Sequence, residues 1–174
     1  FKNSTGLPDR SQVSTARDIA KLALYLHRTY PEYYHYFSAP TAEFGDWRGS
    51  RAKHNHNELV VNNKGIDGLK TGFICDSGYN LAASAGTGQN RIISVVFGGR
   101  TPERRNVLTE NLLADALALL AARDSGGTVA ATPGQRGYLA DSAWRGEDLA
   151  CASAEYLSQN SYLVGVLFDE WSAR

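Results

Sequence analysis

The spacing of apolar residues predicts a helix between Thr15 and Pro31. Over this stretch apolar side chains recur at the three- and four-residue intervals of one helical face, at Ile19, Leu22, Ala23 and Leu26. The Thr15 hydroxyl can cap the first turn, and Asp18 follows three residues later, as in a capping box. Pro31 cannot continue a helix. We therefore expect a helix that ends before Pro31 and carries one apolar face.

Three segments in the middle of the chain have the pattern of β-strands. They are Ile66–Phe73, Leu81–Ala85 and Arg91–Phe97. The third is the clearest, because β-branched and aromatic residues, which favour strands, occupy most of its positions. Gly98-Gly99 ends it, and the turn-forming residues 86–90 separate it from the second segment. The pattern predicts three strands in close succession.

A second amphipathic helix is predicted to begin at Thr101-Pro102-Glu103. This tripeptide combines a capping hydroxyl, a first-turn proline and an early acidic residue. A wide apolar stripe follows, made of Leu108, Leu112, Leu113, Ala116, Leu119 and Leu120. Such a stripe is suited to lie on a sheet. Three strands between two amphipathic helices predict an α/β layered fold.

Residues 30–46 are rich in aromatic side chains. These are Tyr30, Tyr33, Tyr34, Tyr36, Phe37 and Phe44. An aromatic run of this kind either lines a ligand groove or packs against a helix or sheet. Packing is the interpretation that we favour for this segment.

The composition changes at Asp124, and this change suggests a domain boundary. Residues 124–134 are rich in Gly, Ala, Thr and Pro, which is typical of a linker. Residues 135–174 contain no motif that assigns a function, and Tyr162–Phe168 has the composition of one strand. We therefore divide the chain into one folded unit at residues 1–123, a linker at 124–134 and an unassigned C-terminal segment at 135–174.

Charge and cysteine content narrow the function classes. The chain has 18 basic and 18 acidic residues and no cluster of Lys or Arg, which argues against a nucleic-acid partner. Cys75 and Cys151 are too few and too far apart for a metal-binding framework, so they either pair in an oxidising compartment or remain free thiols. On a strand, His54 and His56 would lie on the same face and could form half of a metal site. The sequence shows no third ligand for such a site. We predict no metal site.

Lys70-Thr71-Gly72 is the motif that carries the most chemistry. The lysine supplies a positive charge and the threonine a directed hydrogen bond, while the glycine lets a ligand approach the backbone. Together they can hold a carboxylate. Three residues alone occur by chance in many proteins, but this motif lies within the longer setting Gly65–Phe73.

Further motifs surround this tripeptide. They are Phe1–Asp9, residues 12–18, Asn55–Leu59, Ser77–Leu81 and Arg91–Gly99. In this order and spacing they resemble the low-molecular-weight penicillin-binding proteins, which are serine D-alanyl-D-alanine carboxypeptidases. The resemblance covers about residues 1–122.

The resemblance implies a β-lactamase/penicillin-binding-protein-like fold, in which helices flank an antiparallel sheet. In that family the nucleophile motif S-x-x-K and the second motif S-x-N lie upstream of a stretch like Phe1–Asp9. We therefore expect the domain to be incomplete in this chain and this chain alone to be inactive. The missing N-terminal half of the domain would then be a partner of this chain.

The resemblance also implies roles for individual residues. Lys70 is expected to be catalytic, by tuning the electrostatics of the site, and to bind the terminal carboxylate of the substrate with Thr71 and Gly72. The backbone N–H of Phe73 would donate to the oxyanion. His56 lies between two asparagines that border the cleft in the family, where other members often have a basic residue. No cofactor is implied.

The activity implied is removal of the terminal D-alanine from peptidoglycan stem peptides ending in D-Ala-D-Ala, through an acyl-enzyme. β-Lactams would bind the same site, and the location would be the periplasm or another extracytoplasmic part of a bacterial envelope. Two alternatives remain open. One is a non-catalytic module that lacks the nucleophile and binds peptidoglycan peptides, and the other is a serine β-lactamase.

Two segments match the missing motifs by letter alone. Ser50-Arg51-Ala52-Lys53 fits S-x-x-K, and Ser158-Gln159-Asn160 fits S-x-N. A catalytic S-x-x-K needs its serine at the start of a buried helix, and the polar residues after Ser50 do not predict one. Ser158 lies in the unassigned segment, where the order of motifs would be scrambled. We expect neither segment to be catalytic.

Overall fold

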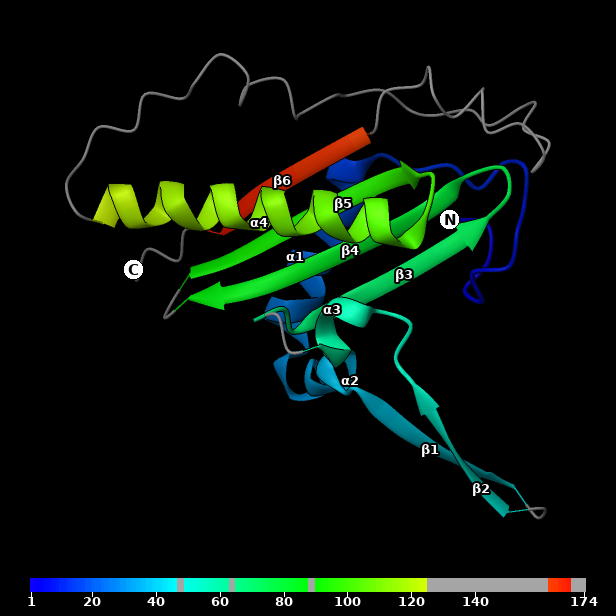
Figure 1. The fold of residues 1–174 in the computed structure, drawn as a ribbon. Helices are drawn as coiled ribbons and strands as arrows, with labels where there is room; N and C mark the ends of the chain where they lie inside the picture. The colour runs from blue at the N-terminus through cyan, green and yellow to red at the C-terminus, as the bar shows by residue number, and fades with distance from the viewer. Residues whose placement is uncertain (47–48, 63–64, 88–89, 125–162, 170–174) are drawn as a thin grey trace.

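A four-stranded antiparallel sheet forms the centre of the structure, and one long helix covers each of its faces (Figure 1). The structure is a computed structural model, and it describes residues 1–46, 49–62, 65–87, 90–124 and 163–169. The strands follow the order β3-β4-β5-β6. Their bounds are Gly68–Ile74 for β3, Gly78–Thr87 for β4, Asn90–Gly99 for β5 and Leu163–Asp169 for β6.

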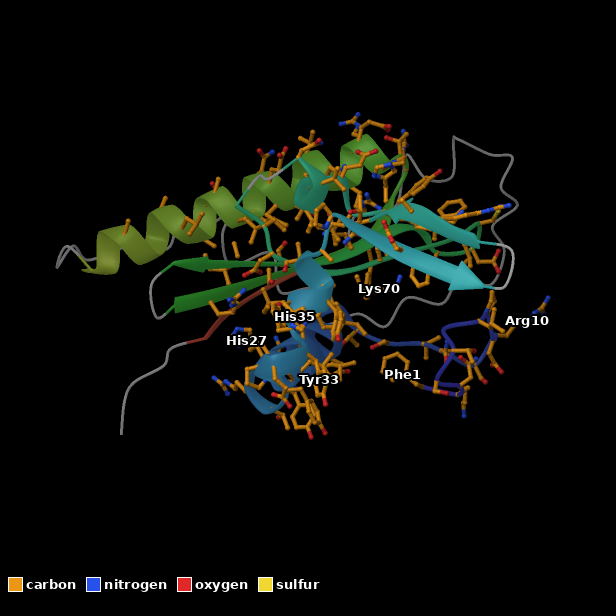
Figure 2. The ribbon with its side chains drawn as sticks, turned by 90° about the horizontal axis from the view of Figure 1, so that it is seen from below. Phe1, Arg10, His27, Tyr33, His35 and Lys70 are labelled. Atoms are coloured by element: carbon orange, nitrogen blue, oxygen red, sulfur yellow. The ribbon has the colours of Figure 1, made fainter. Side chains whose placement is uncertain are left out.

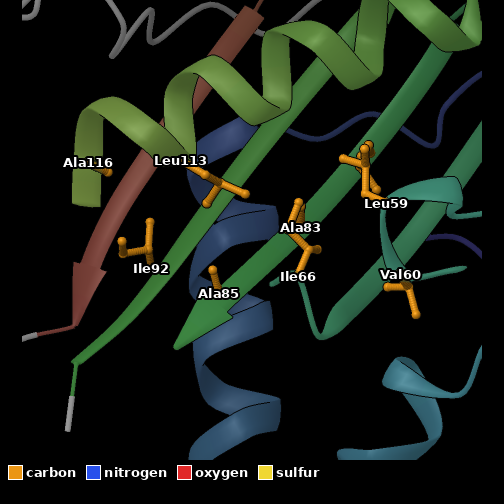
Figure 3. Close-up of a cluster of buried hydrophobic side chains, with 9 residues drawn as sticks. Leu59, Val60, Ile66, Ala83, Ala85, Ile92, Leu113 and Ala116 are labelled. Carbon is orange, nitrogen blue, oxygen red and sulfur yellow. The ribbon is translucent and has the colours of Figure 1, made fainter. Parts of the chain in front are cut away.

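The two central strands are apolar on both faces because each face meets a helix. On one face, Ala83 of β4 and Ile92 of β5 pack with Leu113 of helix α4, which spans Pro102–Asp124 (Figure 3). On the other face, Ile93 and Val95 of β5 pack with helix α1, which spans Ala16–Thr29. Side chains alternate between the faces of a strand, so burial on both faces produces the nearly continuous apolar runs of the sequence.

The predicted first helix is confirmed, but its predicted apolar face is wrong in part. The Thr15 hydroxyl accepts a hydrogen bond from the Asp18 N–H at 3.1 Å, as a capping box requires. The side chains buried against the sheet are Ala16, Ala20 and Ala23. Leu22, which we expected on the apolar face, is 38% exposed. Small alanines let the helix lie close to the sheet, and the longer leucine points away from that contact.

The second predicted helix is also confirmed. The Thr101 hydroxyl accepts a hydrogen bond from the Arg104 N–H at 3.2 Å and caps its first turn. Of the predicted stripe, Leu112, Leu113 and Ala116 are buried and Leu108 is partly buried. The side chains of Leu119 and Leu120 lie outside the described residues.

Short elements connect the first helix to the sheet. They are the 3-10 helix η1 (Pro31–Tyr33), helix α2 (His35–Ser38), strands β1 (Thr41–Asp46) and β2 (Gly49–His54), and helix α3 (Glu58–Val61). Strands β1 and β2 pair with each other as a separate hairpin that projects from the sheet (Figure 1).

The aromatic run within these elements packs less than we expected. Tyr34 is buried and Phe37 packs against the core, as the favoured interpretation required. The other aromatic residues of the run are exposed, and they are Tyr30, Tyr33, Tyr36 and Phe44. Tyr30 still meets the ring of Tyr25 of α1 edge-on, with centroids 6.1 Å apart. The packing interpretation is therefore wrong for Tyr33, Tyr36 and Phe44. The short helices turn only one face toward the sheet, and Phe44 lies on the projecting hairpin.

All three predicted strands are confirmed as β3, β4 and β5, and the strand composition at Tyr162–Phe168 corresponds to β6. The fold class, an antiparallel sheet flanked by helices, is confirmed. The proposed linker lies outside the described residues apart from Asp124, which ends α4. The proposed domain boundaries stay a prediction. None of the helices in the described part of the chain has the length and apolar character needed to cross a bilayer.

The packing predicts how two leucine substitutions differ. Leu113→Ala should lower the free energy of unfolding by about 2–5 kcal/mol, because it leaves a cavity between α4 and the sheet. Leu22→Ala is the matched control and should cost less than about 1 kcal/mol, because its side chain is exposed. Urea unfolding followed by circular dichroism measures both changes. Equal losses in the two variants would contradict the buried faces described above.

Candidate functional site

The Lys70-Thr71-Gly72 motif lies on an edge strand. Within the described residues β3 pairs only with β4, where Lys70 lies opposite Ala82 and Thr71 opposite Leu81. The other edge of β3 therefore has backbone N–H and C=O groups without a strand partner in this part of the chain. Such an edge can accept an extended peptide as an additional strand.

The first two residues of β3 are buried, and the motif residues after them are not. Gly68 and Leu69 are buried, Lys70 and Gly72 are exposed, and Thr71 is partly buried. The Lys70 ammonium donates a hydrogen bond to the Thr71 carbonyl oxygen. Figure 2 shows Lys70 apart from His27 and His35, which belong to the helical part of the chain. The ammonium is thus accessible to solvent and to a ligand.

The glycine of the motif leaves space beside the backbone. A methyl group added at Gly72 would meet only the Asn80 Cβ, at 3.9 Å, which is an ordinary van der Waals contact. Apart from Gly72 itself and its two neighbours in the chain, no other atom of the described structure lies within 4 Å of that position. A ligand can therefore approach the backbone of Gly72 closely.

Phe73 holds the end of β3 against β4. Its ring stacks on that of Tyr79, with ring centroids 4.2 Å apart, and the two residues are direct partners in the strand register. Cross-strand aromatic pairs of this kind stabilise a sheet. Cys75, just beyond β3, is disulfide-bonded, and Cys151, the other cysteine of the chain, lies outside the described residues.

The segment Asn55–Asn57 contacts the start of β3. The buried Asn57 side chain donates to the Gly68 carbonyl oxygen at 3.3 Å and accepts from the Leu59 N–H at 3.3 Å. Asn55 in turn donates to the Ala39 carbonyl oxygen at 3.0 Å. His56, between the two asparagines, is exposed. The structure thus brings this segment to the strand that carries the motif, and the role of His56 stays a prediction.

A polar cluster at the start of β3 was missed by the sequence analysis. The Arg91 guanidinium forms an ion pair with Asp67 at 2.5 Å, and the Ser84 hydroxyl donates to the other oxygen of the Asp67 carboxylate. The Tyr34 hydroxyl lies 2.6 Å from the Ser84 hydroxyl, and burial raises the pKa of Tyr34. Because Ser84 gives its proton to the carboxylate, Tyr34 donates to Ser84. The sequence places Asp67 beside the motif, but only the strand register reveals its partners.

A further missed cluster connects α4 to α3. Arg105 is 4% exposed, and its guanidinium donates to the Asn106 side-chain oxygen at 2.8 Å and 3.1 Å. Asn106 donates to the Glu58 carboxylate at 2.9 Å. Burial lowers the pKa of Arg105, although a guanidinium stays protonated at any physiological pH. A Cβ added at Gly99 would lie 2.9 Å from the Arg105 Cβ, so α4 packs tightly against the end of β5.

The segment that matches S-x-x-K by letter has the wrong backbone for catalysis. Ser50 and Lys53 lie on strand β2, so the backbone between them is extended and not helical. An S-x-x-K nucleophile needs the two residues one helical turn apart, and the prediction that this segment is not a helix is confirmed. The segment that matches S-x-N, at Ser158–Asn160, lies outside the described residues.

The structure does not support a shared face for the two alternating histidines. Strand β2 ends at His54, so His56 is not on that strand. Among the described residues, no group of three or more His, Cys, Asp or Glu side chains is placed to hold a metal ion.

The family model and the relatives that match this chain all point to one protein family. A sequence model of the D-alanyl-D-alanine carboxypeptidase family matches residues 1–101. The chain is 38% identical over 113 residues to D-alanyl-D-alanine carboxypeptidase DacA of Escherichia coli K12, covering 65% of this chain and 27% of that protein. It is 36% identical over 118 residues to DacF of Bacillus subtilis, covering 65% of this chain and 29% of that protein. The chain thus spans less than a third of these relatives.

Comparison with solved structures agrees. The D-alanyl-D-alanine carboxypeptidase DacD of Francisella tularensis superposes with a TM-score of 0.60 at 25% identity, over 67% of this chain and 40% of that one. Penicillin-binding protein D2 of Listeria monocytogenes, in its ampicillin-bound form, has a TM-score of 0.58 at 34% identity, over 66% of this chain and 46% of that one. The resemblance predicted from the motifs is confirmed. This chain belongs to the D-alanyl-D-alanine carboxypeptidase family.

Proposed function

We propose that this chain supplies the carboxylate-binding strand of a serine-type D-Ala-D-Ala carboxypeptidase. The complete enzyme removes the terminal D-alanine from peptidoglycan stem peptides. The observation that carries this proposal is the position of Lys70-Thr71-Gly72 on the edge of β3, where the lysine is exposed and the strand has no second partner among the described residues. Membership of the carboxypeptidase family supports the same activity.

The substrate peptide binds along β3 in this proposal. Its extended backbone pairs with the edge of the strand, which aligns its terminal carboxylate with the motif. Adjacent residues of a strand point to opposite faces, so Lys70 and Thr71 approach a carboxylate at the edge from different sides. The ammonium supplies charge, the hydroxyl supplies a directed hydrogen bond, and Gly72 leaves room for the substrate backbone.

The chemistry requires two further parts. The backbone N–H of Phe73 donates to the oxyanion that forms when the scissile carbonyl is attacked. The nucleophilic serine belongs to the S-x-x-K motif expected upstream of Phe1, and it forms an acyl-enzyme that water hydrolyses. Lys70 contributes positive charge near the reacting groups, and His56 borders the cleft. The reaction needs no cofactor.

The proposal also includes a reaction with β-lactams and a location in the bacterial cell envelope. A Listeria relative has been solved in ampicillin-bound and cefotaxime-bound forms. We infer that the complete enzyme formed with this chain is acylated by β-lactams, because it shares the motif strand of that family. Its substrate is part of the cell wall, so its location is the periplasm or another extracytoplasmic compartment of a bacterium.

Removing the lysine charge tests the carboxylate-binding role. In a protein that joins this chain to the nucleophile-bearing segment, Lys70→Ala should lower kcat/KM for a D-Ala-D-Ala peptide at least about a hundredfold, or about 3 kcal/mol. Lys70→Arg should not restore activity, because a planar guanidinium cannot replace a compact ammonium. Lys53→Ala is the matched control, since this exposed lysine lies on the separate hairpin. Near-normal kinetics in Lys70→Ala would contradict the proposed role.

Labelling with a fluorescent penicillin separates the proposed enzyme from the two alternatives. The 174-residue chain alone should acquire no covalent label, because Ser50 lies on a strand instead of a catalytic helix. The protein joined to the nucleophile-bearing segment should be labelled at one serine, and a non-catalytic binding module would not be. Rapid hydrolysis of the label would instead indicate a β-lactamase. Gel fluorescence and mass spectrometry of the labelled peptide provide the measurement.

A further inference from the structure

The motif on β3 works only if the strand keeps one register. Side chains alternate with a period of two, so a slip by one residue would move Lys70 to the face of Thr71 and Thr71 to the opposite face. β3 is open to such a slip because, in the described part of the chain, it is an edge strand that is hydrogen-bonded on one side only. The burial of Leu69 favours one register, and polar contacts outside the ladder to β4 can select it further.

The polar cluster at the start of β3 has the geometry for this task. We propose that Asp67, Ser84, Arg91 and Tyr34, here named the β3 clamp, fix the register of β3 and so position Lys70 and Thr71 for the substrate. The consequence for catalysis rests on the function proposed above, whereas the effect on the strand does not. The clamp residues are positioning residues, since they act through β3 and not on the reacting atoms.

The clamp joins three neighbouring strands at one point. Asp67 directly precedes β3, Ser84 lies on β4 and Arg91 lies on β5. The two oxygens of the Asp67 carboxylate are used separately, one by Ser84 and one by Arg91. The backbone N–H of Asp67 also donates to the Ser84 carbonyl oxygen at 3.0 Å. A slip of β3 would break all of these bonds together, which is how a directional cluster selects one register.

Tyr34 extends the clamp to the helical layer. Its hydroxyl reaches Ser84, and the Arg91 guanidinium lies 5.3 Å from the centroid of its ring. His27 of α1 packs edge-on against the same ring, with centroids 4.7 Å apart. Tyr34 is 8% exposed and the Arg91 side chain 17% exposed, whereas the Asp67 side chain is 37% exposed, so the ion pair lies at the border between the core and the solvent.

Gly68 shows that the start of β3 is fitted to the clamp. A Cβ at this position would lie 3.5 Å from the Ser84 hydroxyl, 3.5 Å from the Tyr34 hydroxyl and 3.2 Å from the Phe37 Cβ. A side chain at Gly68 would therefore meet the clamp directly, and the glycine lets the backbone lie beside it. From another direction Asn57 donates to the carbonyl oxygen of the same glycine. Asn57 and the β3 clamp thus both hold the backbone that leads into the motif.

Hydrogen exchange in the 174-residue chain tests the effect on the strand. Asp67→Asn keeps the shape of the side chain but removes its charge. Backbone amides of β3 should then exchange at least about tenfold faster, while those of β5 change less than about twofold. Asp115→Asn, the same change on the exposed face of α4, should alter neither strand. Unchanged exchange in β3, or equal acceleration in β3 and β5, would overturn the proposal.

Two further variants keep the test decisive if Asp67→Asn does not fold. Ser84→Ala removes the hydroxyl that joins Asp67 to Tyr34 and should also accelerate exchange in β3 selectively. Arg91→Lys keeps the charge and should preserve much of the protection, whereas Arg91→Gln should lose it. Equal exchange in the lysine and glutamine variants would contradict the ion pair as the basis of the clamp.

Kinetics of the protein joined to the nucleophile-bearing segment test the positioning. Asp67→Asn should lower kcat/KM for a D-Ala-D-Ala peptide at least about tenfold at a temperature where the variant is fully folded, and Arg91→Lys should retain more activity than Arg91→Gln. If Lys70→Ala lowers kcat/KM at least about a hundredfold and Asp67→Asn leaves it unchanged, positioning is wrong and the proposed function stands. If Lys70→Ala has no effect, the proposed function is wrong, and hydrogen exchange alone decides whether the clamp sets the register.

Discussion

The antiparallel pairing of β3 with β4 is the constraint on which the candidate site depends. It places Lys70 opposite Ala82 and Thr71 opposite Leu81, and it leaves the outer edge of β3 without a strand partner among the described residues. A strand paired on both sides could not accept a substrate peptide, and a strand paired on neither side would have no fixed direction for its side chains. The site requires this intermediate condition, in which one edge is fixed and the other is available.

The burial of β3 changes along its length, and this change divides the strand into two parts. Gly68 and Leu69 are buried, and Leu69 packs in the same cluster as Ile93 of β5 and Ala20 of α1. From Lys70 onward the strand is mostly exposed. The first part therefore gains its stability from the core between the sheet and α1, while the second part presents chemistry to solvent. Packing holds the strand where its function does not need access, which is a common division at binding sites built on rigid elements.

Sequence patterns predicted those features that depend on local spacing. The two long helices follow from capping residues and apolar intervals, and the motif strand follows from its own letters. The patterns failed where the outcome depends on a partner far along the chain. Leu22 has the right spacing for a core residue, yet alanines form the contact, because the distance between α1 and the sheet selects small side chains. Likewise, Asp67 meets partners 17 and 24 residues away, and only the register of three strands brings them together.

The ion pair of Asp67 with Arg91 lies next to the motif in the sequence. Asp67 is three residues before Lys70. Arg91 and Ser84 occupy both oxygens of Asp67, and no carboxylate in the described residues forms an ion pair with Lys70. Partly buried pairs often add little net stability, since desolvation offsets their attraction, and in some proteins they select one arrangement among several. In the proposal made above, this cluster selects the register of β3, and Lys70 keeps an exposed side chain beside it.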